Sequence, residues 1–421
     1  MSLPLRLRAT GIGWDGGIFA VTAFIAPLLS IFAPLGMAPL FAASALALLI
    51  ADMLRSGGLP RDLIAAFREA RALRLFALLC LMVCLWALAS TAWAVEPTQA
   101  LVSTGQVLSV ACAALVHIAA AGRLHAQARG FLGRALLAGI LCALTLLTIE
   151  LLDDAWIGRR LQDLSNIGPD QIFSRYNRGL TVLLLLTFPA LLALASAAKR
   201  FALGLAVLVV IMIYYGSSLQ LAAVAALLAV LLTLALPRAV PWLIGGAIVL
   251  FVAAAPLLPP LTMKTLDTDA LTARTQNVSI AHRIIVWRFS AERIADKPLT
   301  GWGMNAARAI PGGKEKVVLI APTSIMGEKL PLHTHNAPLQ WWLELGLPGA
   351  ALMAGLWLFP LSLIARRTAR RASRAIAIGG FTAAFVIANL SFGAWQAWWL
   401  SSLGLAGALI LLFLPARREA A

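Results

Sequence analysis

The 421-residue chain is 61% hydrophobic and only 12% charged, and its mean hydropathy is +0.88. A soluble protein needs a more polar surface than this, so the sequence predicts an all-α integral membrane protein with many crossings of the lipid bilayer. The net charge of +16 does not indicate nucleic-acid binding, because most arginines lie in short segments between apolar runs, where they orient a membrane protein.

Twelve apolar runs follow one another along the chain, each close to the roughly 20 residues that cross a bilayer. Lys and Arg concentrate in alternate connecting segments. This alternation predicts that those segments and both termini are cytoplasmic. The predicted spans are 17–35, 37–54, 75–94, 100–121, 131–151, 177–197, 201–215, 218–236, 240–258, 349–365, 375–393 and 397–414.

One long polar insertion divides the chain into three predicted parts. Residues 1–258 form an N-terminal transmembrane bundle of about nine helices, residues 259–335 a large periplasmic loop domain that contains helices, and residues 336–421 the C-terminal transmembrane helices. The insertion carries ten Lys or Arg against six Asp or Glu. Long loops are translocated whatever their charge. We therefore expect either a solvated loop or a basic surface for an anionic, lipid-attached substrate.

Two arginines mark the point where the 152–176 loop re-enters the predicted bundle. Arg175 and Arg178 are three residues apart, so they share a face of a helix. A guanidinium donates two parallel hydrogen bonds to phosphate oxygens, which makes either arginine a candidate donor-binding residue. The alternative is that boundary arginines only extend toward the membrane interface. The polar neighbours Tyr176 and Asn177 favour the functional interpretation.

The insertion contains a predicted amphipathic helix at 279–296. Arg283 and Trp287 are i, i+4 neighbours on it, and Arg288 and Glu292 form a second such pair. About 140° separates the two arginines, because each helical residue turns by roughly 100°. We therefore expect one arginine to bind ligand while the other pairs with the glutamate or meets solvent. The pattern leaves open which arginine does which.

The segment 333–349 joins the polar insertion to the next apolar run. Asn336 can cap a helix that carries Gln340 and Glu344 at the i+4 and i+8 positions, as a polar stripe on an apolar rod. Polar side chains at a membrane edge are costly and usually functional. For the glutamine and the glutamate, the alternative is capping and interhelical hydrogen bonding. Gly346 is expected to begin a break or kink.

These motifs resemble the signature of the O-antigen ligase/polymerase superfamily, and the overall layout is most similar to bacterial O-antigen ligase. The resemblance implies a GT-C-like glycosyltransferase of the bacterial inner membrane with its active site on the periplasmic face. Such an enzyme transfers O-antigen polysaccharide from undecaprenyl diphosphate to a sugar hydroxyl of lipid A–core oligosaccharide, in lipopolysaccharide biosynthesis. It needs neither a metal nor another cofactor. The signature residues are Arg283, Trp287, Pro298, Gly301, Gly303, His335, Asn336, Leu339, Glu344, Gly346 and Gly349.

The resemblance assigns the key histidine to His335, the loop arginine to Arg283 or Arg288, and the arginine at the membrane edge to Arg175 or Arg178. A neutral imidazole can accept the proton of an attacking hydroxyl, and arginines can stabilise a departing diphosphate. The spacing of two histidines around Thr334 suggests a metal only weakly, because no carboxylates accompany them at suitable spacing. The expected supporting residues are Trp287, His333, Asn336, Gln340 and Glu344.

Three other functions stay open at this point. An O-antigen polymerase or a protein oligosaccharyltransferase of the same superfamily would share the donor and differ in the acceptor, which no motif identifies. A transporter or flippase of lipid-linked sugars would also have many crossings. It is disfavoured because the predicted spans hold almost no ionisable residues at mid-bilayer, where a coupling pathway needs them.

Overall fold

The computed structural model describes residues 12–162, 175–214, 217–265, 278–319, 325–367 and 370–415. This part of the chain is almost entirely helical, apart from an antiparallel hairpin of β1 (Lys316–Val318) and β2 (Met326–Glu328). Each predicted span coincides with a helix. These helices are α2 (Gly13–Phe32), α3 (Met37–Ser56), α5 (Arg71–Ala89), α6 (Pro97–Ala121), α7 (Ala126–Leu152), α10 (Asn177–Ala193), α11 (Ala197–Ile213), α12 (Ser217–Ala235), α13 (Val240–Ala254), α17 (Ala337–Arg367), α18 (Arg371–Leu390) and α19 (Ala397–Phe413).

The length and composition of these helices confirm an all-α membrane protein. Among the described residues, eight helical stretches are long and apolar enough to cross a bilayer, and α10, α13 and α19 are shorter apolar helices. Many large apolar side chains on the outside of the bundle are exposed, including Leu231 on α12 and Leu250 on α13. Such a surface suits lipid better than water. The number of crossings stays a prediction.

Helix α10 is the centre of the bundle. Every residue from Gly179 to Ala190 is buried, and α10 packs against α2, α7, α18 and α19. A helix that is apolar on all sides must be enclosed on all sides. The position of α10 fixes its first turn, and that turn carries Arg178.

Helix α17 is longer than the span predicted at 349–365, because it joins that span to the predicted polar-stripe helix across a kink. Gly346 has φ +62° and ψ −163° at the kink, and Pro348 has no N–H to donate. The carbonyls of Leu343 and Glu344 instead accept hydrogen bonds from the N–H groups of Trp302 and Gly303, both at 2.9 Å. The predicted kink is confirmed, and the glycine-rich turn before the site packs directly against it.

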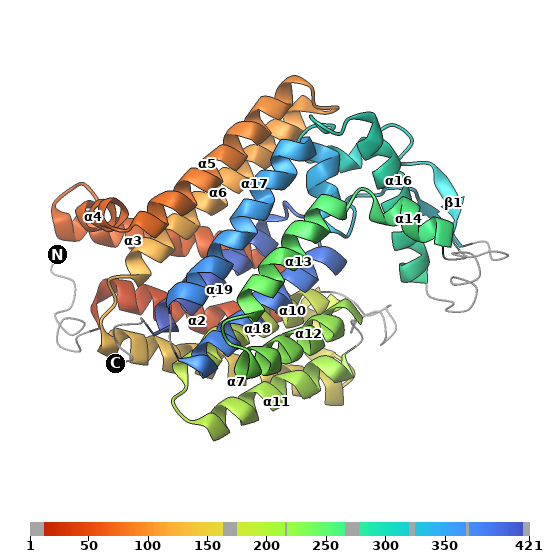
Figure 1. Ribbon diagram of the computed structural model, residues 1–421. Coiled ribbons are helices and arrows are strands. Elements are labelled where there is room, and N and C mark those ends of the chain that lie inside the picture. The colour runs from red at the N-terminus through yellow and green to blue at the C-terminus, as the bar shows by residue number, and fades with distance from the viewer. Residues whose placement is uncertain are drawn as a thin grey trace.

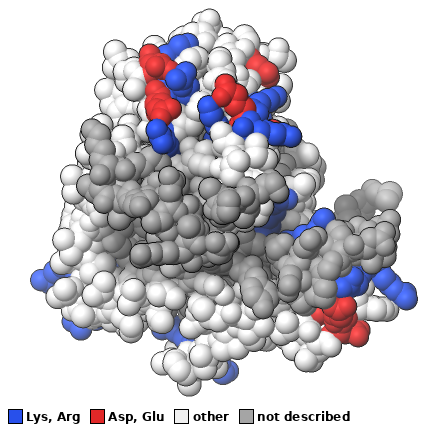
Figure 2. Space-filling view, turned by 90° about the vertical axis from the view of Figure 1, so that its right-hand side faces the viewer, with Lys and Arg blue, Asp and Glu red and all other residues white. Residues whose placement is uncertain are grey.

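The described part of the long insertion lies at one end of the molecule. It contains α14 (Leu258–Thr265), α16 (Val278–Asp296), the 3-10 helix η3 (Ala306–Arg308) and the β-hairpin. In Figure 1, α14, α16 and β1 lie at the right-hand end, whereas α4 (Arg61–Glu69) lies at the opposite end. Helix α16 confirms the predicted amphipathic helix, and it packs against α17. Figure 2 views this end of the molecule and shows cationic and anionic side chains mingled on its upper part.

Parts of both predicted outer loops lie outside the described residues. These are 163–174 in the loop before α10, and 266–277 and 320–324 in the long insertion. The boundaries of the predicted loop domain at 259–335 therefore stay a prediction.

The end of the bundle that carries α4 is held by a cluster of charged residues. Arg55 donates to Asp15 at 2.7 Å, and Arg123 donates to the same carboxylate at 3.0 Å. The fully buried Asp52 accepts the backbone N–H of Leu63 at 2.9 Å and lies 3.3 Å from Arg55. This charge cluster ties α2, α3 and α4 to the turn after α6. It joins segments that the charge pattern assigns to one side of the membrane.

Candidate active site

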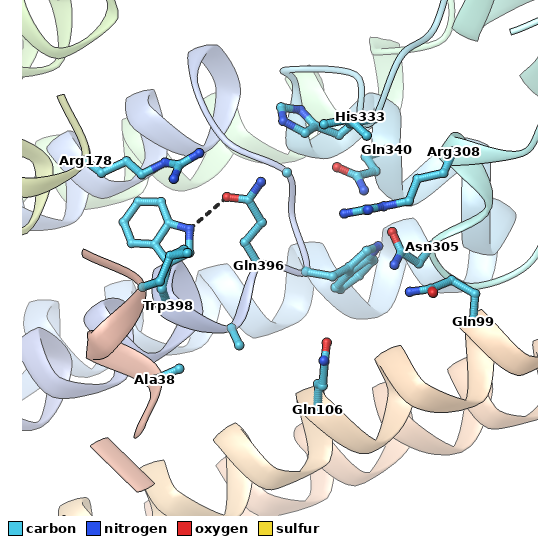
Figure 3. Close-up of a pocket in the computed structure, with 15 residues that line it drawn as sticks. Ala38, Gln99, Gln106, Arg178, Asn305, Arg308, His333, Gln340, Gln396 and Trp398 are labelled. Carbon is cyan, nitrogen blue, oxygen red and sulfur yellow. Dashed lines mark hydrogen bonds between the residues drawn. The ribbon is translucent and has the colours of Figure 1, made fainter. Parts of the chain in front are cut away.

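A cavity of about 480 Å³ lies where α6, α10, η3, the residues before α17 and the connection between α18 and α19 meet. Figure 3 shows His333, Arg178 and Arg308 on one side of it and Gln106 of α6 on the other. Most of its labelled side chains come from segments far apart in the sequence. The polar lining consists of Gln99, Gln106, Arg178, Asn305, Arg308, His333, Gln340 and Gln396.

Hydrogen bonds to the two histidines before α17 fix which ring nitrogen of each carries the proton. His335 Nδ1 lies 2.7 Å from the carbonyl oxygen of Ser391, and a carbonyl only accepts, so Nδ1 carries the proton and Nε2 keeps its lone pair. The backbone N–H of His335 donates to His333 Nδ1 at 3.2 Å. This leaves His333 with its proton on Nε2. His333 lines the cavity and His335 lies next to it, with the ring centroids 4.2 Å apart.

The surroundings of both imidazoles favour the neutral form. Burial, and then the charges of His335, Arg308, Arg178 and Arg283, lower the pKa of His333 to about 3. Burial also lowers the pKa of His335 below its ordinary value, against the opposing effect of the bond to Ser391. A neutral imidazole is the form that accepts a proton. His335 also has φ +53°, a left-handed backbone conformation that is uncommon outside glycine and often occurs at functional sites.

The structure separates the arginines at the start of α10. Arg178 lines the cavity, with its guanidinium carbon 5.9 Å from the ring centroid of Trp398. Both arginines are exposed, but Arg175 is not part of the cavity lining. Since only one of the two reaches the cavity, Arg178 is the stronger candidate for binding a phosphate group.

The two arginines of α16 also differ. Arg288 is exposed and pairs with Glu292 at 3.2 Å. Arg283 is half-buried, and its Nη2 donates to Ser218 at 3.3 Å. Its Nε is buried and has no hydrogen-bond partner among the described residues. Burial lowers the pKa of Arg283. A half-buried cation beside two imidazoles is better placed to bind an anionic ligand than an exposed, paired one.

Arg308 is a site residue that the sequence reasoning missed. It is the last residue of η3 and lines the cavity beside Asn305 and Gln340 (Figure 3). Nothing in its local sequence distinguishes it from the other cations of the insertion. Its position depends on a hydrogen-bond network centred on Glu344, which the sequence cannot reveal.

Glu344 is fully buried and holds the surrounding loops in place. Its carboxylate accepts the backbone N–H groups of Asn305 at 2.9 Å and Ala307 at 3.3 Å, the side-chain amide of Gln340 at 3.0 Å, and the indole N–H of Trp395. All four donors are neutral. Glu344 thereby fixes η3 and the connection between α18 and α19 against α17. These contacts are of the kind that the alternative of interhelical hydrogen bonding predicts, and they make Glu344 a candidate positioning residue.

The remaining supporting residues also position the site. Asn336 Oδ1 caps α17 by accepting the N–H of Leu339 at 3.0 Å. Gln340 Oε1 accepts the N–H of Ala394 at 2.9 Å, and the indole of Trp287 donates to the carbonyl of Thr334 at 2.9 Å. Each bond fixes the backbone on one side of the histidine pair.

The described residues contain no group of three or more His, Cys, Asp or Glu side chains placed to hold a metal ion. The cations around the cavity are arginines, which stabilise phosphate charge directly. The arrangement therefore combines neutral imidazoles with three guanidinium groups in and beside one cavity. That combination suits proton transfer from a hydroxyl together with stabilisation of a phosphate leaving group.

Part of the chain is similar to proteins of a known family. Residues 182–354 match the family model described as O-antigen ligase. The matched residues include both histidines and α16, whereas Arg178 precedes them.

Curated relatives named "Putative polysaccharide ligase" are similar to this chain over different lengths. One from Rickettsia conorii is 33% identical over 35% of each chain, so the match spans only about a third of that relative. Another from Rickettsia felis is 29% identical over 64% of this chain and 65% of the relative, and one from Rickettsia bellii is 26% identical over 75% of each.

Proposed function

We propose that the chain is a metal-independent glycosyltransferase of the O-antigen ligase superfamily, a proposal supported by the matched family model and by the similarity to the polysaccharide ligases named above. It transfers O-antigen polysaccharide from undecaprenyl diphosphate to a sugar hydroxyl of lipid A–core oligosaccharide, at the periplasmic face of the inner membrane. The observation that carries the proposal is the pair of adjacent histidines, oriented by their hydrogen bonds, beside Arg178, Arg283 and Arg308. The matched family and the names of the relatives support the class of reaction.

His335 is proposed as the base, through its free Nε2. The acceptor hydroxyl oxygen attacks the anomeric carbon of the donor sugar, while Nε2 takes the hydroxyl proton. The bond from the anomeric carbon to the diphosphate oxygen breaks, and undecaprenyl diphosphate leaves with the bonding electrons. The arginines stabilise the charge that grows on this leaving group. The imidazolium then returns its proton to water.

The hydrogen bonds support different roles for the two histidines. His333 uses Nδ1 to accept the N–H of His335, so its Nε2 carries a proton that it can donate to a ligand oxygen. His335 uses Nδ1 to donate to Ser391, so only its Nε2 has a lone pair available. We therefore propose His333 as a hydrogen-bond donor to substrate and His335 as the acceptor-activating base.

The test is reconstitution of the purified protein in lipid vesicles with the lipid-diphosphate polysaccharide donor, the lipid A–core acceptor and a chelator. We expect polysaccharide-bearing acceptor to form, and His335→Ala to reduce transfer by about 10²- to 10⁴-fold, the contribution of a positioned general base. His125→Ala, at the start of α7, is the matched control. Full transfer by His335→Ala would refute the assigned base, and loss on chelation would refute metal independence.

The same experiment separates the alternative functions. Longer donor chains with unchanged acceptor would identify a polymerase, and transfer only to added protein would identify an oligosaccharyltransferase. Movement of donor across the vesicle membrane without a covalent product would identify a transporter. Each of these results would overturn the proposed ligase function.

A further inference from the structure

The wall of the cavity formed by α6 is polar but uncharged, and the mechanism proposed above does not use it. Gln99, Ser103 and Gln106 are spaced i, i+4, i+7, so they form a stripe on one face of the helix. Gln99 and Gln106 line the cavity, and Gln106 lies across it from His333 in Figure 3. Helix α6 is apolar enough to cross a bilayer. Amides on such a helix are costly unless they meet water or a polar ligand.

The hydrogen bonds of this wall orient its amides. Gln99 Nε2 and Asn305 Nδ2 both donate to the hydroxyl oxygen of the buried Ser103, at 3.1 and 2.8 Å. Within the described part of the chain, no residue donates to the carbonyl oxygen of either amide. Both oxygens are thus available as acceptors. The side chain of Gln106 makes no hydrogen bond to any described residue, so it offers a donor and an acceptor to a ligand.

This chemistry favours a neutral hydroxylated ligand over an anion. A carbonyl oxygen accepts the proton of a sugar hydroxyl but repels a phosphate oxygen, which has no proton to give. The cations of the cavity are on Arg178 and Arg308, which Figure 3 shows across the cavity from Gln106, with Arg308 beside Asn305 where the two sides meet. The diphosphate-bound sugar therefore belongs on the arginine side, and the sugar that meets α6 is the acceptor.

We propose that Gln99, Gln106 and Asn305 form a saccharide subsite that binds the hydroxyl groups of a neutral acceptor sugar, and that Gln106 determines which sugar is accepted. The assignment rests on the proposed transferase function, since that function brings a hydroxylated acceptor to this cavity. Gln106 is the informative residue because its side chain holds no other described part of the protein. Asn305 and Gln99 also fix Ser103, so changes there would disturb the wall itself.

The first test measures binding without donor, by saturation-transfer NMR with a neutral trisaccharide of hexoses and the full-length protein in lipid nanodiscs. Gln106→Leu removes one or two hydrogen bonds and should raise the Kd about three- to tenfold. Gln106→Glu keeps an acceptor for hydroxyl protons and should bind the trisaccharide within about threefold of the unchanged protein. Gln127→Leu is the matched control, because Gln127 at the start of α7 is exposed as Gln106 is but does not line the cavity, and it should leave the Kd unchanged.

Two results would overturn the subsite. One is equal trisaccharide binding by the unchanged protein and Gln106→Leu, or none by either. The other combines two measurements: inorganic diphosphate binds the unchanged protein more tightly than Gln106→Glu, and neither substitution changes the trisaccharide affinity. This result would mean that the wall binds an anion. Unchanged thermal unfolding of both variants would show that the effects are local.

The second test separates this proposal from the proposed function. In reconstituted transfer, Gln106→Leu should raise the KM for acceptor about three- to tenfold with little change in kcat, because its hydrogen bond is made before and during the reaction alike. It should also change the order of preference among acceptors with different sugars. Transfer with an unchanged acceptor KM would refute the subsite alone. Weakened trisaccharide binding by a protein with no transferase activity would refute the proposed function alone.

Discussion

The two ends of the bundle use carboxylates in opposite ways. In the charge cluster beside α4, Asp15 accepts hydrogen bonds from Arg55 and Arg123, so arginine and carboxylate neutralise each other. At the cavity, Glu344 accepts only from neutral N–H groups. Within the described residues, Arg178 and Arg308 form no ion pair with a carboxylate. The difference shows that arginine content alone does not mark a binding site. What matters is whether a carboxylate already neutralises the arginine.

A second buried carboxylate follows the same rule as Glu344. Glu150 of α7 is fully buried and accepts the backbone N–H groups of Ile157 and Gly158 together with the hydroxyl of Tyr176. These partners are also neutral, although Arg178 lies only two residues beyond Tyr176 in the sequence. Both buried carboxylates thus hold backbone in place and leave the arginine of α10 available for ligand.

The largest effect is expected from Glu344→Ala. Two backbone N–H groups, one amide and one indole would lose their shared acceptor in a buried position, at a cost of about 3–5 kcal/mol. Thermal unfolding in detergent would measure the loss of stability. Transfer activity should fall as well, because η3 and Arg308 would no longer be held. Activity that persists at a temperature where the variant is folded would show that Glu344 does not position the site.

Arg283→Ala tests whether an arginine that has no carboxylate partner among the described residues contributes more to transfer than the ion-paired Arg288. Removing a charge-stabilising donor from the reaction site should reduce kcat by about 10²- to 10³-fold, with little change in unfolding temperature. Arg288→Ala is the matched control on the same helix. Its side chain is 67% exposed in its pair with Glu292, so its loss should change stability by less than about 1 kcal/mol and leave transfer intact. Equal effects of the two substitutions would contradict the comparison.

Asp52→Ala tests the charge cluster at the end of the bundle that carries α4. Asp52 is fully buried and holds the N–H of Leu63 and the guanidinium of Arg55. Its removal should cost about 2 kcal/mol, less than for a fully buried pair because Arg55 is partly exposed. Transfer by the folded protein should stay normal, because the cluster lies at the far end of the bundle. A selective loss of kcat without loss of stability would mean that the charge cluster is functional.

Local patterns predicted the parts of the site that depend on local structure. Asn336 caps a helix, and Gly346 with Pro348 kinks it, because capping and the loss of one N–H act within a single turn. The choice between Arg283 and Arg288 depended on which face of α16 is turned toward the rest of the protein, where Arg283 meets Ser218, and spacing gives only the angle between the two arginines. Arg308 could not be found at all, since Glu344 positions it from a distant part of the chain.

The smallest expected effect is on the pH dependence of transfer, which tests His335 as the base. Burial, and then the charge of Arg283, lower the pKa of His335 below its ordinary value. The neutral base therefore persists to lower pH. The midpoint of the acid limb in the pH profile of kcat/KM should lie below the unperturbed histidine pKa of about 6.5.

Arg283→Ala should shift this acid limb in a known direction. The substitution removes a positive charge, so protonation of His335 becomes easier and its pKa rises. The limb should then move to higher pH in the activity that this variant retains. Arg288→Ala should leave the limb in place, because its charge is already paired with Glu292. A limb that does not move in Arg283→Ala would place the titrating group away from this arginine and would remove His335 as the base.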